Sequence, residues 1–412
     1  MVQLQESRLK FSMPRQVQTL ALVLIVIGII TTLAQIWVPD GLHHAAEGAE
    51  HAAEHHGNPR LFLSIHLGLL FAIPLALGGV FFAAFNHLSG AAWSVTVRRV
   101  AESTFWFLPV VLLLSGLVFL GSGDVFHHWV HAEGDHLIEH KSAWLNVPRF
   151  VVMNIVVIAI WFVFGFLFWK NSVDQDKDGN PAHSKLMAKL GAGFLVVFGL
   201  SYSANSWDMS MALEPHWFST LWALYIFAGL ALVLYASLIL WTWFLKRQGL
   251  LGDAVNENHW HDLGKYMWGH TIFWAYMAIS QYMLIWYGHL PEETIFYATR
   301  TNDTGWYIVT VLVPVLRFVL PFFLIIKREW KRNLNYLAGI SVLVLVGQIV
   351  DMYWIAYPTL AGGDFVWFSW RELGAIAFVV GAYILVVGKA LERNALIPKK
   401  DPRLEECLHF HQ

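Results

Sequence analysis

Six ionisable side chains and one amide interrupt the apolar segments of this 412-residue chain. They are His66, Glu102, His270, Arg317, Asp351 and Glu372, and the amide is Gln348. Carboxylates and imidazoles donate and accept protons when their surroundings bring their pKa near the working pH. A charge in hydrocarbon is costly and is therefore a candidate for function by default. The set could carry protons or deprotonate a bound molecule.

If the apolar segments are helices, the rise of 1.5 Å per residue gives each group a depth. Arg317 falls about 18 Å from the end of its segment, near the middle and level with Gln348. In the outer half lie His66, Asp351 and Glu372. In the inner half lie His270 and Glu102, and Glu102 is near the start of its segment. A structural explanation is equally open, in which Arg317 pairs with Asp351 to join two helices and the others lie in hydrated vestibules.

A second polar group lies in a short connection, WDMSMALEPHWFSTLWALY, at residues 207–225. Asp208, Glu214 and His216 are crowded there between aromatic residues. Two carboxylates and an imidazole beside an apolar surface could relay protons to the outside. Alternatively, the carboxylates cap helix N-termini, which favour negative charge.

Two further loops are rich in histidine. They contain His43, His44, His51, His55 and His56, and His127, His128, His131, His136 and His140. Imidazole binds zinc and copper, but the spacing is loose and alanine-rich, which is typical of a solvated loop. We expect no metal site here; contact with an extracytoplasmic partner, or proton buffering near it, is the alternative.

The segment DQDKDG at 174–179 copies the first half of a calcium-binding EF loop. The twelfth position of such a loop should be a bidentate glutamate. Lys185 occupies that position and would repel the ion. We therefore interpret the segment as a polar turn.

The elements that must hold these groups follow from the composition. Apolar residues make up 57% of the chain and charged residues 14%, against about 45–50% and about 25% in soluble proteins. Charges alternate with apolar runs of about 20 residues, the length that crosses a bilayer as a helix. These runs predict an all-α polytopic membrane protein with ten transmembrane helices at about 18–38, 61–85, 101–121, 147–169, 187–206, 217–245, 263–288, 304–326, 335–358 and 367–390.

Residues 1–412 form one membrane domain in this interpretation, with 391–412 as a cytoplasmic tail. Most of the 27 Lys and Arg residues fall in the N-terminal segment, the even-numbered loops and the C-terminal segment. The positive-inside rule then places both termini in the cytoplasm. The first apolar run is expected to stay as an anchor, because no convincing signal-peptide cleavage site follows it.

Composition also excludes several classes. A net charge of −2 argues against nucleic-acid binding. The single cysteine, Cys407, excludes disulfides, cysteine-ligated zinc and iron–sulfur clusters within this chain. Only His66 and His270 lie clearly inside the predicted spans, so a buried haem or copper centre is not expected.

Three segments carry a resemblance to a known family: 207–225, quoted above, FWAYMAISQYMLIWYGHLPEET at 273–294, and DPRLEECLHFHQ at 401–412. Together they resemble the NrfD-like, polysulfide-reductase-like membrane subunits of alternative complex III, a bacterial quinol:cytochrome c oxidoreductase. The last segment is similar to the ActF branch of that family rather than to the ActC branch.

The resemblance implies ten helices, with spans 2–5 and 6–9 as two four-helix bundles and spans 1 and 10 flanking them. It implies location in the bacterial inner membrane and no redox cofactor bound by this chain, with quinol or quinone as a ligand of the assembly. The implied partners hold haem c and iron–sulfur clusters: a multihaem cytochrome c subunit, an iron–sulfur subunit, an ActC-like membrane subunit, a monohaem cytochrome c and small membrane subunits.

We therefore expect a subunit that supports quinol oxidation and moves protons, and that is an enzyme only as part of its complex. In this hypothesis Asp351, Glu372 and His66 accept protons, the 207–225 connection provides their exit, and Arg317 fixes the local charge. A purely structural anchor is the main alternative. An ion-coupled secondary transporter is a third, although the sequence shows no matched pair of broken helices of the kind that transporters use.

Overall fold

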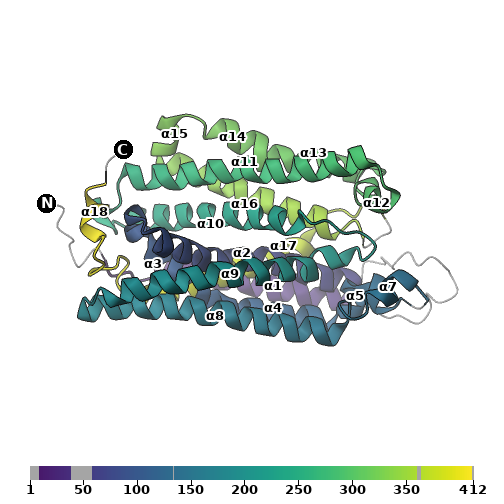
Figure 1. Cartoon of the computed structure of the whole chain (residues 1–412), viewed down its shortest axis with the longest axis horizontal. Coiled ribbons are helices and arrows are strands. Elements are labelled where there is room, and N and C mark those ends of the chain that lie inside the picture. The colour runs from purple at the N-terminus through teal and green to yellow at the C-terminus, as the bar shows by residue number, and fades with distance from the viewer. Residues whose placement is uncertain (1–8, 39–57, 133, 360–362, 411–412) are drawn as a thin grey trace.

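Long helices lying side by side make up the protein, as the computed structural model shows (Figure 1). The structure describes residues 9–38, 58–132, 134–359 and 363–410, and these contain helices but no strand. The longest helices are α1 (Arg15–Trp37), α2 (Pro59–Ser89), α8 (Val147–Asp178), α9 (Ala182–Met209), α10 (Trp222–Arg247), α11 (Glu257–Gly288), α16 (Leu334–Ala356) and α17 (Trp370–Glu392).

Two further long segments are interrupted. One consists of η2 (Ala92–Ser94), α3 (Val95–Ser103), η3 (Thr104–Phe107) and α4 (Leu108–Leu120). The other consists of α13 (Thr304–Pro314), the π-helical segment η6 (Val315–Val319) and α14 (Leu320–Leu324). Pro314 and Pro321 flank η6, and a proline within a helix removes a hydrogen-bond donor and displaces the preceding turn.

The prediction of an all-α polytopic membrane protein is confirmed. Within the described ranges, nine helical segments are long and apolar enough to cross a membrane. They coincide with nine of the ten predicted spans. The remaining predicted span, 263–288, corresponds to α11, which has 32 residues but is outside the set of nine. The N-terminal half of α11 carries several polar residues.

The short helices collect at the two ends of the bundle (Figure 1). One end, which we call the α12 end, holds α5 (Ser122–Val125), α6 (His127–Val130), α7 (His136–His140), η4 (Met211–Leu213) and α12 (Pro291–Thr299). The other, the α18 end, holds η5 (Gly252–Ala254), α15 (Arg328–Arg332) and α18 (Leu404–Leu408). Leu396 N donates to Leu9 O over 2.9 Å, so the first and last described segments meet at the α18 end.

Helix contacts divide the molecule as the resemblance implies. Helices α2, α4, α8 and α9 pack on one another, as do α10, α11, α13 and α16. Helices α1 and α17 pack together, and α17 also lies against α2. Helix α2 contacts α10 and α16 of the second group, so it lies where the two bundles and the flanking pair meet.

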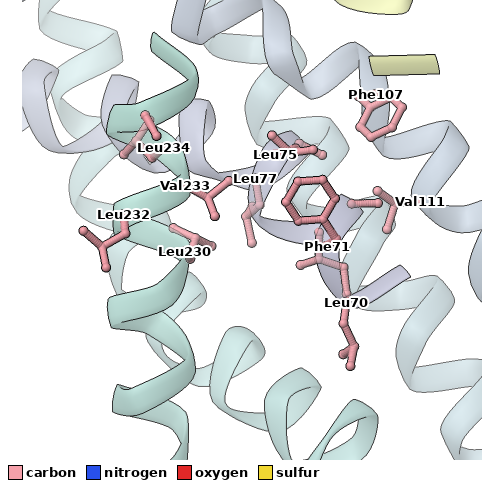
Figure 2. Close-up of a cluster of buried hydrophobic side chains, with 14 of the residues drawn as sticks. Leu70, Phe71, Leu75, Leu77, Phe107, Val111, Leu230, Leu232, Val233 and Leu234 are labelled. Carbon is pink, nitrogen blue, oxygen red and sulfur yellow. The ribbon is translucent and has the colours of Figure 1, made fainter. Parts of the chain in front are cut away.

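The apolar core is built around α2 (Figure 2). Phe71 and Leu75 of this helix lie toward Phe107 and Val111, and Leu70 and Leu77 also belong to the buried core. On the other side of α2, α10 contributes a run of buried residues at 228–239. Both helices are therefore apolar on nearly every face, as expected of helices surrounded by protein within a membrane.

Residues 393–410, after the last span, fold back onto the α18 end. Leu396, Ile397 and Cys407 are fully buried there, and Leu404 is nearly so. The predicted tail is thus a packed part of the structure from Leu396 to Cys407. The sequence of this segment is polar because it contains charged residues between these positions, and the sequence alone does not show which residues pair with them.

Close contact between α1 and α17 depends on glycine. A Cβ atom at Gly381 would lie 2.6 Å from the carbonyl oxygen of Ala21 and 2.8 Å from Leu24 Cβ. Small residues allow this approach between membrane helices. At Gly199 of α9, by contrast, a Cβ atom would have no neighbour within 4 Å.

We expect Gly381→Ala to lower the thermal unfolding midpoint of the detergent-solubilised protein, because overpacking against a backbone costs about 1–3 kcal/mol. The matched control is Gly199→Ala, which should leave the midpoint unchanged or raise it, since alanine is the better helix former. Equal midpoints for the two variants would contradict the packing described here.

Candidate functional site

A cluster of four buried polar side chains lies between η6, α10 and α16. Arg317 Nη2 is 3.4 Å from Asp351 Oδ2. The hydroxyl of Tyr225 donates to the other oxygen of Asp351, and Arg317 Nη1 donates to Gln348 Oε1. Each of the four side chains is buried. The structure therefore brings together Arg317, Gln348 and Asp351, and it adds Tyr225, which the sequence did not indicate.

Local backbone features make room for this cluster. Arg317 lies in the π-helical segment, where the wider turn displaces its side chain from regular α-helical positions. A Cβ atom at Gly229 would approach both Arg317 Nη2 and Gln348 Oε1 to 3.0 Å, and one at Gly347 would lie 3.3 Å from Arg317 Cδ. The guanidinium also lies over the ring of Trp274, 5.0 Å from its centroid.

Hydrogen bonding within the cluster is incomplete. Asp351 Oδ2 and Arg317 Nε have no hydrogen-bond partner among the described residues, although both are buried. Most buried polar atoms in proteins are satisfied, so each exception calls for an explanation. This oxygen faces Arg317 Nη2 at 3.4 Å, so the carboxylate is paired in charge but makes no hydrogen bond there.

A small cavity adjoins the cluster. It measures about 20 Å³ and is lined by Gln348 and by polar residues of α9, among them Asn205 and Ser206. Such a volume is enough for about one water molecule. The same cavity touches Met209, whose carbonyl oxygen is 2.7 Å from His66 Nε2. The cavity thus lies between the Asp351 cluster and His66.

His66 itself is fully buried in α2. Because its Nε2 bonds to a carbonyl oxygen, that nitrogen carries the proton in the neutral ring. Its Nδ1 has no hydrogen-bond partner in the described part of the chain. His66 therefore combines an engaged donor with a free acceptor.

Glu372 differs from the expectation. It is in the first turn of α17, where its side chain accepts from the Ser369 N–H over 2.7 Å as part of a capping box. Arg60 Nε lies 2.8 Å from its Oε1, and Tyr357 donates to it over 2.9 Å. Helix α17 begins at Trp370 rather than at residue 367, so Glu372 is at the start of the helix and takes part in its capping. A carboxylate with this many donors serves to hold α17 to α2.

The three residues of the 207–225 connection each have a partner. Asp208 lies 2.6 Å from Arg149, Glu214 lies 2.6 Å from Arg300, and His216 lies 2.6 Å from Asp135. Asp208 is in the last turn of α9 and Glu214 follows η4. The alternative that these carboxylates cap helix N-termini is therefore wrong: they pair with arginines instead.

At the α18 end lies a second buried network that the sequence did not reveal. Glu102 is fully buried and contacts His87 at 3.5 Å, Arg98 at 3.2 Å and Arg99 at 3.3 Å. Arg98 also pairs with Asp401 of the C-terminal segment. Glu102 does not open its span, because the helical segment begins at Ala92, ten residues earlier.

His87 is the residue that sequence analysis missed. The predicted span ended at residue 85, which left His87 in a loop. Helix α2 instead extends to Ser89, and the imidazole is buried. It stacks on Phe168 with the ring planes 3° apart. The available signal was Gly90, three residues after His87, because a glycine commonly ends a helix and the φ of Gly90, 67°, is typical of a helix C-cap.

Charge explains how the C-terminal segment is held. Burial opposes ionisation of Asp401, but the guanidinium groups of Arg98 and Arg403 and the hydrogen bond from the Arg403 N–H together outweigh it and lower the pKa of Asp401 to about 2. Burial raises the pKa of the Cys407 thiol, which lies 3.3 Å from His259 Nε2. At neutral pH the segment is thus held by a charged carboxylate and carries an unreactive thiol.

The remaining motifs are placed as follows. The 174–179 segment was expected to be a polar turn, but residues up to Asp178 belong to the end of α8 and Gly179 is its C-cap. Asp174 pairs with Lys177, Asp176 with Arg99, and Asp178 with His183. Among the described residues, no three His, Cys, Asp or Glu side chains are arranged to hold a metal ion. The first histidine-rich loop, with His43, His44, His51, His55 and His56, lies outside the described residues.

Taken together, the predicted site residues occupy separate positions along the bundle. Arg317, Gln348 and Asp351 form one cluster, and His66 lies across the small cavity from it. Glu102 and His270 lie toward the α18 end, and Glu372, Asp208, Glu214 and His216 lie toward the α12 end. No family model matches the chain, and no curated protein matches it.

We expect Asp401→Asn to make Cys407 accessible, because the amide cannot form the ion pair that holds the segment against Arg98. Cys407 is the single cysteine of the chain, so the rate of maleimide labelling in the folded protein reports on this segment alone. The rate should rise on the order of tenfold, in line with the loss of a buried ion pair.

Asp174→Asn is the control, since it removes an exposed ion pair at the same end. Because the folded pKa of Asp401 is below its unfolded value of about 3.9, the stabilisation is complete above about pH 4 and is lost between about pH 4 and pH 2. Equal labelling of the two variants at pH 7 would contradict this account of the segment.

Proposed function

We propose that this protein is an integral membrane subunit of a quinol:cytochrome c oxidoreductase of the alternative complex III type. In this proposal it holds no redox cofactor, supports quinol oxidation and carries protons. The observation that supports it best is the buried Asp351, with one oxygen bonded to Tyr225 and the other facing Arg317 at 3.4 Å without a hydrogen bond. The resemblance of three segments to the ActF branch gives the class of complex.

Proton release is the chemical reason for this assignment. Oxidation of a quinol frees two protons while its electrons leave to a carrier in another subunit. A carboxylate or imidazole with a free acceptor can take such a proton. His66 offers one at Nδ1 and Asp351 has an oxygen paired only in charge with Arg317, while the small cavity is lined by Gln348 of the cluster and by Met209, whose carbonyl oxygen bonds to His66.

The orientation and partners belong to the same proposal. Lysines and arginines are concentrated at the α18 end, which we assign to the cytoplasm of a bacterial inner membrane. The α12 end then faces the multihaem cytochrome c, iron–sulfur and monohaem cytochrome c subunits. The ActC-like subunit and the small membrane subunits would lie beside the bundle.

A structural anchor is the second candidate, and specific contacts favour it. Arg300 donates to the carbonyl oxygens of Phe296, Trp354 and Ile355 and pairs with Glu214. Arg60 and Glu372 likewise join α2 to α17. Charges used in this way hold helices together and need no ligand. The two candidates differ in what happens when Asp351 alone loses its charge.

The class of complex is tested by purification through a tag on this chain in mild detergent. We expect the preparation to show strong c-type haem absorption and to reduce cytochrome c with ubiquinol or menaquinol. A colourless chain that purifies alone, under conditions that keep other respiratory complexes intact, would contradict the proposal and favour the transporter alternative.

We expect Asp351→Asn to leave the complex assembled but to lower quinol turnover or proton yield on the order of tenfold or more, as for loss of an acid–base group. Asn keeps the shape and the bond to Tyr225 but cannot exchange a proton at neutral pH. Asp351→Glu should restore part of the activity, and Asp174→Asn should behave as the unchanged protein.

These variants separate the two candidates. A structural anchor predicts that Asp351→Asn destabilises the protein, because it leaves Arg317 as a buried charge without its partner. It also predicts normal turnover per assembled complex. Normal turnover and proton yield in the assembled Asp351→Asn complex would remove Asp351 from the proposed path.

A further inference from the structure

A second pocket lies at the α18 end, away from the Asp351 cluster. Its volume is about 400 Å³, and polar and aromatic residues share its lining. Asp262, Lys265, Tyr266 and His270 come from successive turns of α11, and the aromatic residues are Trp93, Phe273 and Phe410. Phe410 belongs to the C-terminal segment, which therefore forms one wall of the pocket.

The stacking of rings fixes one side of this pocket. Tyr266 lies between Trp93 and Tyr235, with ring centroids 5.5 Å and 5.3 Å away and the planes nearly parallel in both cases. His270 lies 5.1 Å from Tyr235. Both faces of Tyr266 are therefore covered, and the stack forms a rigid aromatic wall against which a flat ligand ring can lie.

Hydrogen bonding then defines what His270 can recognise. Its Nδ1 lies 2.8 Å from the carbonyl oxygen of Tyr266, so in the neutral ring Nδ1 carries the proton. Nε2 is left as an acceptor, and His270 lines the pocket. A hydroxyl group donates to such a nitrogen, whereas a carbonyl oxygen would meet a lone pair.

The charges in the pocket disfavour a lipid phosphate. Lys265 Nζ is 2.5 Å from Asp262 Oδ1, so the one cationic side chain in the lining is already paired with a carboxylate. An anionic headgroup would compete with Asp262 for it. A neutral ring that bears hydroxyl groups would leave the ion pair of Lys265 with Asp262 intact.

An apolar track leads from the pocket toward the middle of the bundle. Phe273, at the edge of the pocket, lies 6.3 Å from Phe227, and Phe227 lies 5.2 Å from Phe81. All three are partly exposed rather than buried. They form a surface against which an apolar chain attached to the ring can lie.

From this geometry we propose that the pocket at the α18 end binds the reduced, hydroxyl-bearing headgroup of an isoprenoid quinol. A ring hydroxyl donates to His270 Nε2, the ring lies against the stack of Trp93 and Tyr266 and against Phe410, and the tail follows Phe273 and Phe227. This inference rests on the proposed function for its ligand class. It assigns a binding site only, and no electron transfer takes place in it.

The test is photoaffinity labelling of the purified tagged complex with an azido-substituted quinone, reduced to the quinol by dithionite. Labelled peptides are identified by mass spectrometry. We expect label on peptides from 257–288 and from 90–97, and protection by excess decylubiquinol. The fully oxidised analogue should label these peptides less.

Variants then address His270. His270→Phe keeps a ring against Tyr235 but has no acceptor, and it should weaken quinol protection about tenfold, as for one lost hydrogen bond to a buried polar group. His270→Gln offers an acceptor oxygen and should restore part of the protection by quinol. If His270→Phe fails to fold, the protection measured for His270→Gln still tests the site. His289→Asn, on the same helix at the α12 end, is the control.

The outcomes separate this site from the proposed function. A complex with quinol:cytochrome c activity whose label lies only outside these peptides overturns the site and leaves the function standing. Protection by phosphatidylglycerol but not by decylubiquinol also overturns it, in favour of a lipid headgroup. Label at these peptides in a preparation without that activity supports the site and contradicts the proposed function.

Discussion

Helix α2 is enclosed by protein over nearly its whole length, and the arrangement of the other long helices depends on this. In its most apolar stretch, 94% of the residues are buried. A helix without a lipid face must find protein partners for every polar side chain, because hydrocarbon offers none and open water is distant. His66 and His87 find theirs on α9 and on α3, and Arg60 finds its partner on α17.

The enclosed position of α2 also determines where ionisable groups can exist. Both bundles and the flanking pair meet on it, so the spaces between them exclude lipid and water alike. The Asp351 cluster lies in one such space, on helices that contact α2 from the second bundle. Burial raises the free energy of an unpaired charge there, and it strengthens the interaction of a paired charge with its neighbours. The proton exchange that we propose and the attachment of these helices would thus depend on the same pairing of Arg317 with Asp351.

Much of the fold could be predicted from the sequence because the signal is simple. Runs of about 20 apolar residues predicted the long helices, and most boundaries were correct to within several residues, although one helical segment begins at Ala92 instead of residue 101 and α8 ends at Asp178 instead of residue 169. The pairing of Arg317 with Asp351 could also be anticipated, since both fall inside spans. Tyr225 could not, because a tyrosine within an apolar run gives no sign of whether its hydroxyl faces lipid, a surface or a carboxylate.

The network around Glu102 was beyond sequence reasoning for a different reason. Its members come from α2, α3 and the C-terminal segment, and Arg98 and Asp401 are 303 positions apart. Nothing in the spacing of charges predicts which distant pair will meet. Likewise, α17 begins only three residues later than expected, yet this changed Glu372 from a membrane-depth acid into a helix cap.

The docked C-terminal segment has a consequence for biosynthesis. Membrane helices enter the bilayer in the order of translation, so Arg98, Arg99 and Glu102 are inserted long before Asp401 leaves the ribosome. Arg99 gains Asp176 when α8 is inserted, but until Asp401 is made Arg98 shares Glu102 of its own helix with Arg99. Residues made after the tenth long helix therefore complete the charge balance of a segment inserted much earlier. Translation order thus makes this ion pair a late step of assembly.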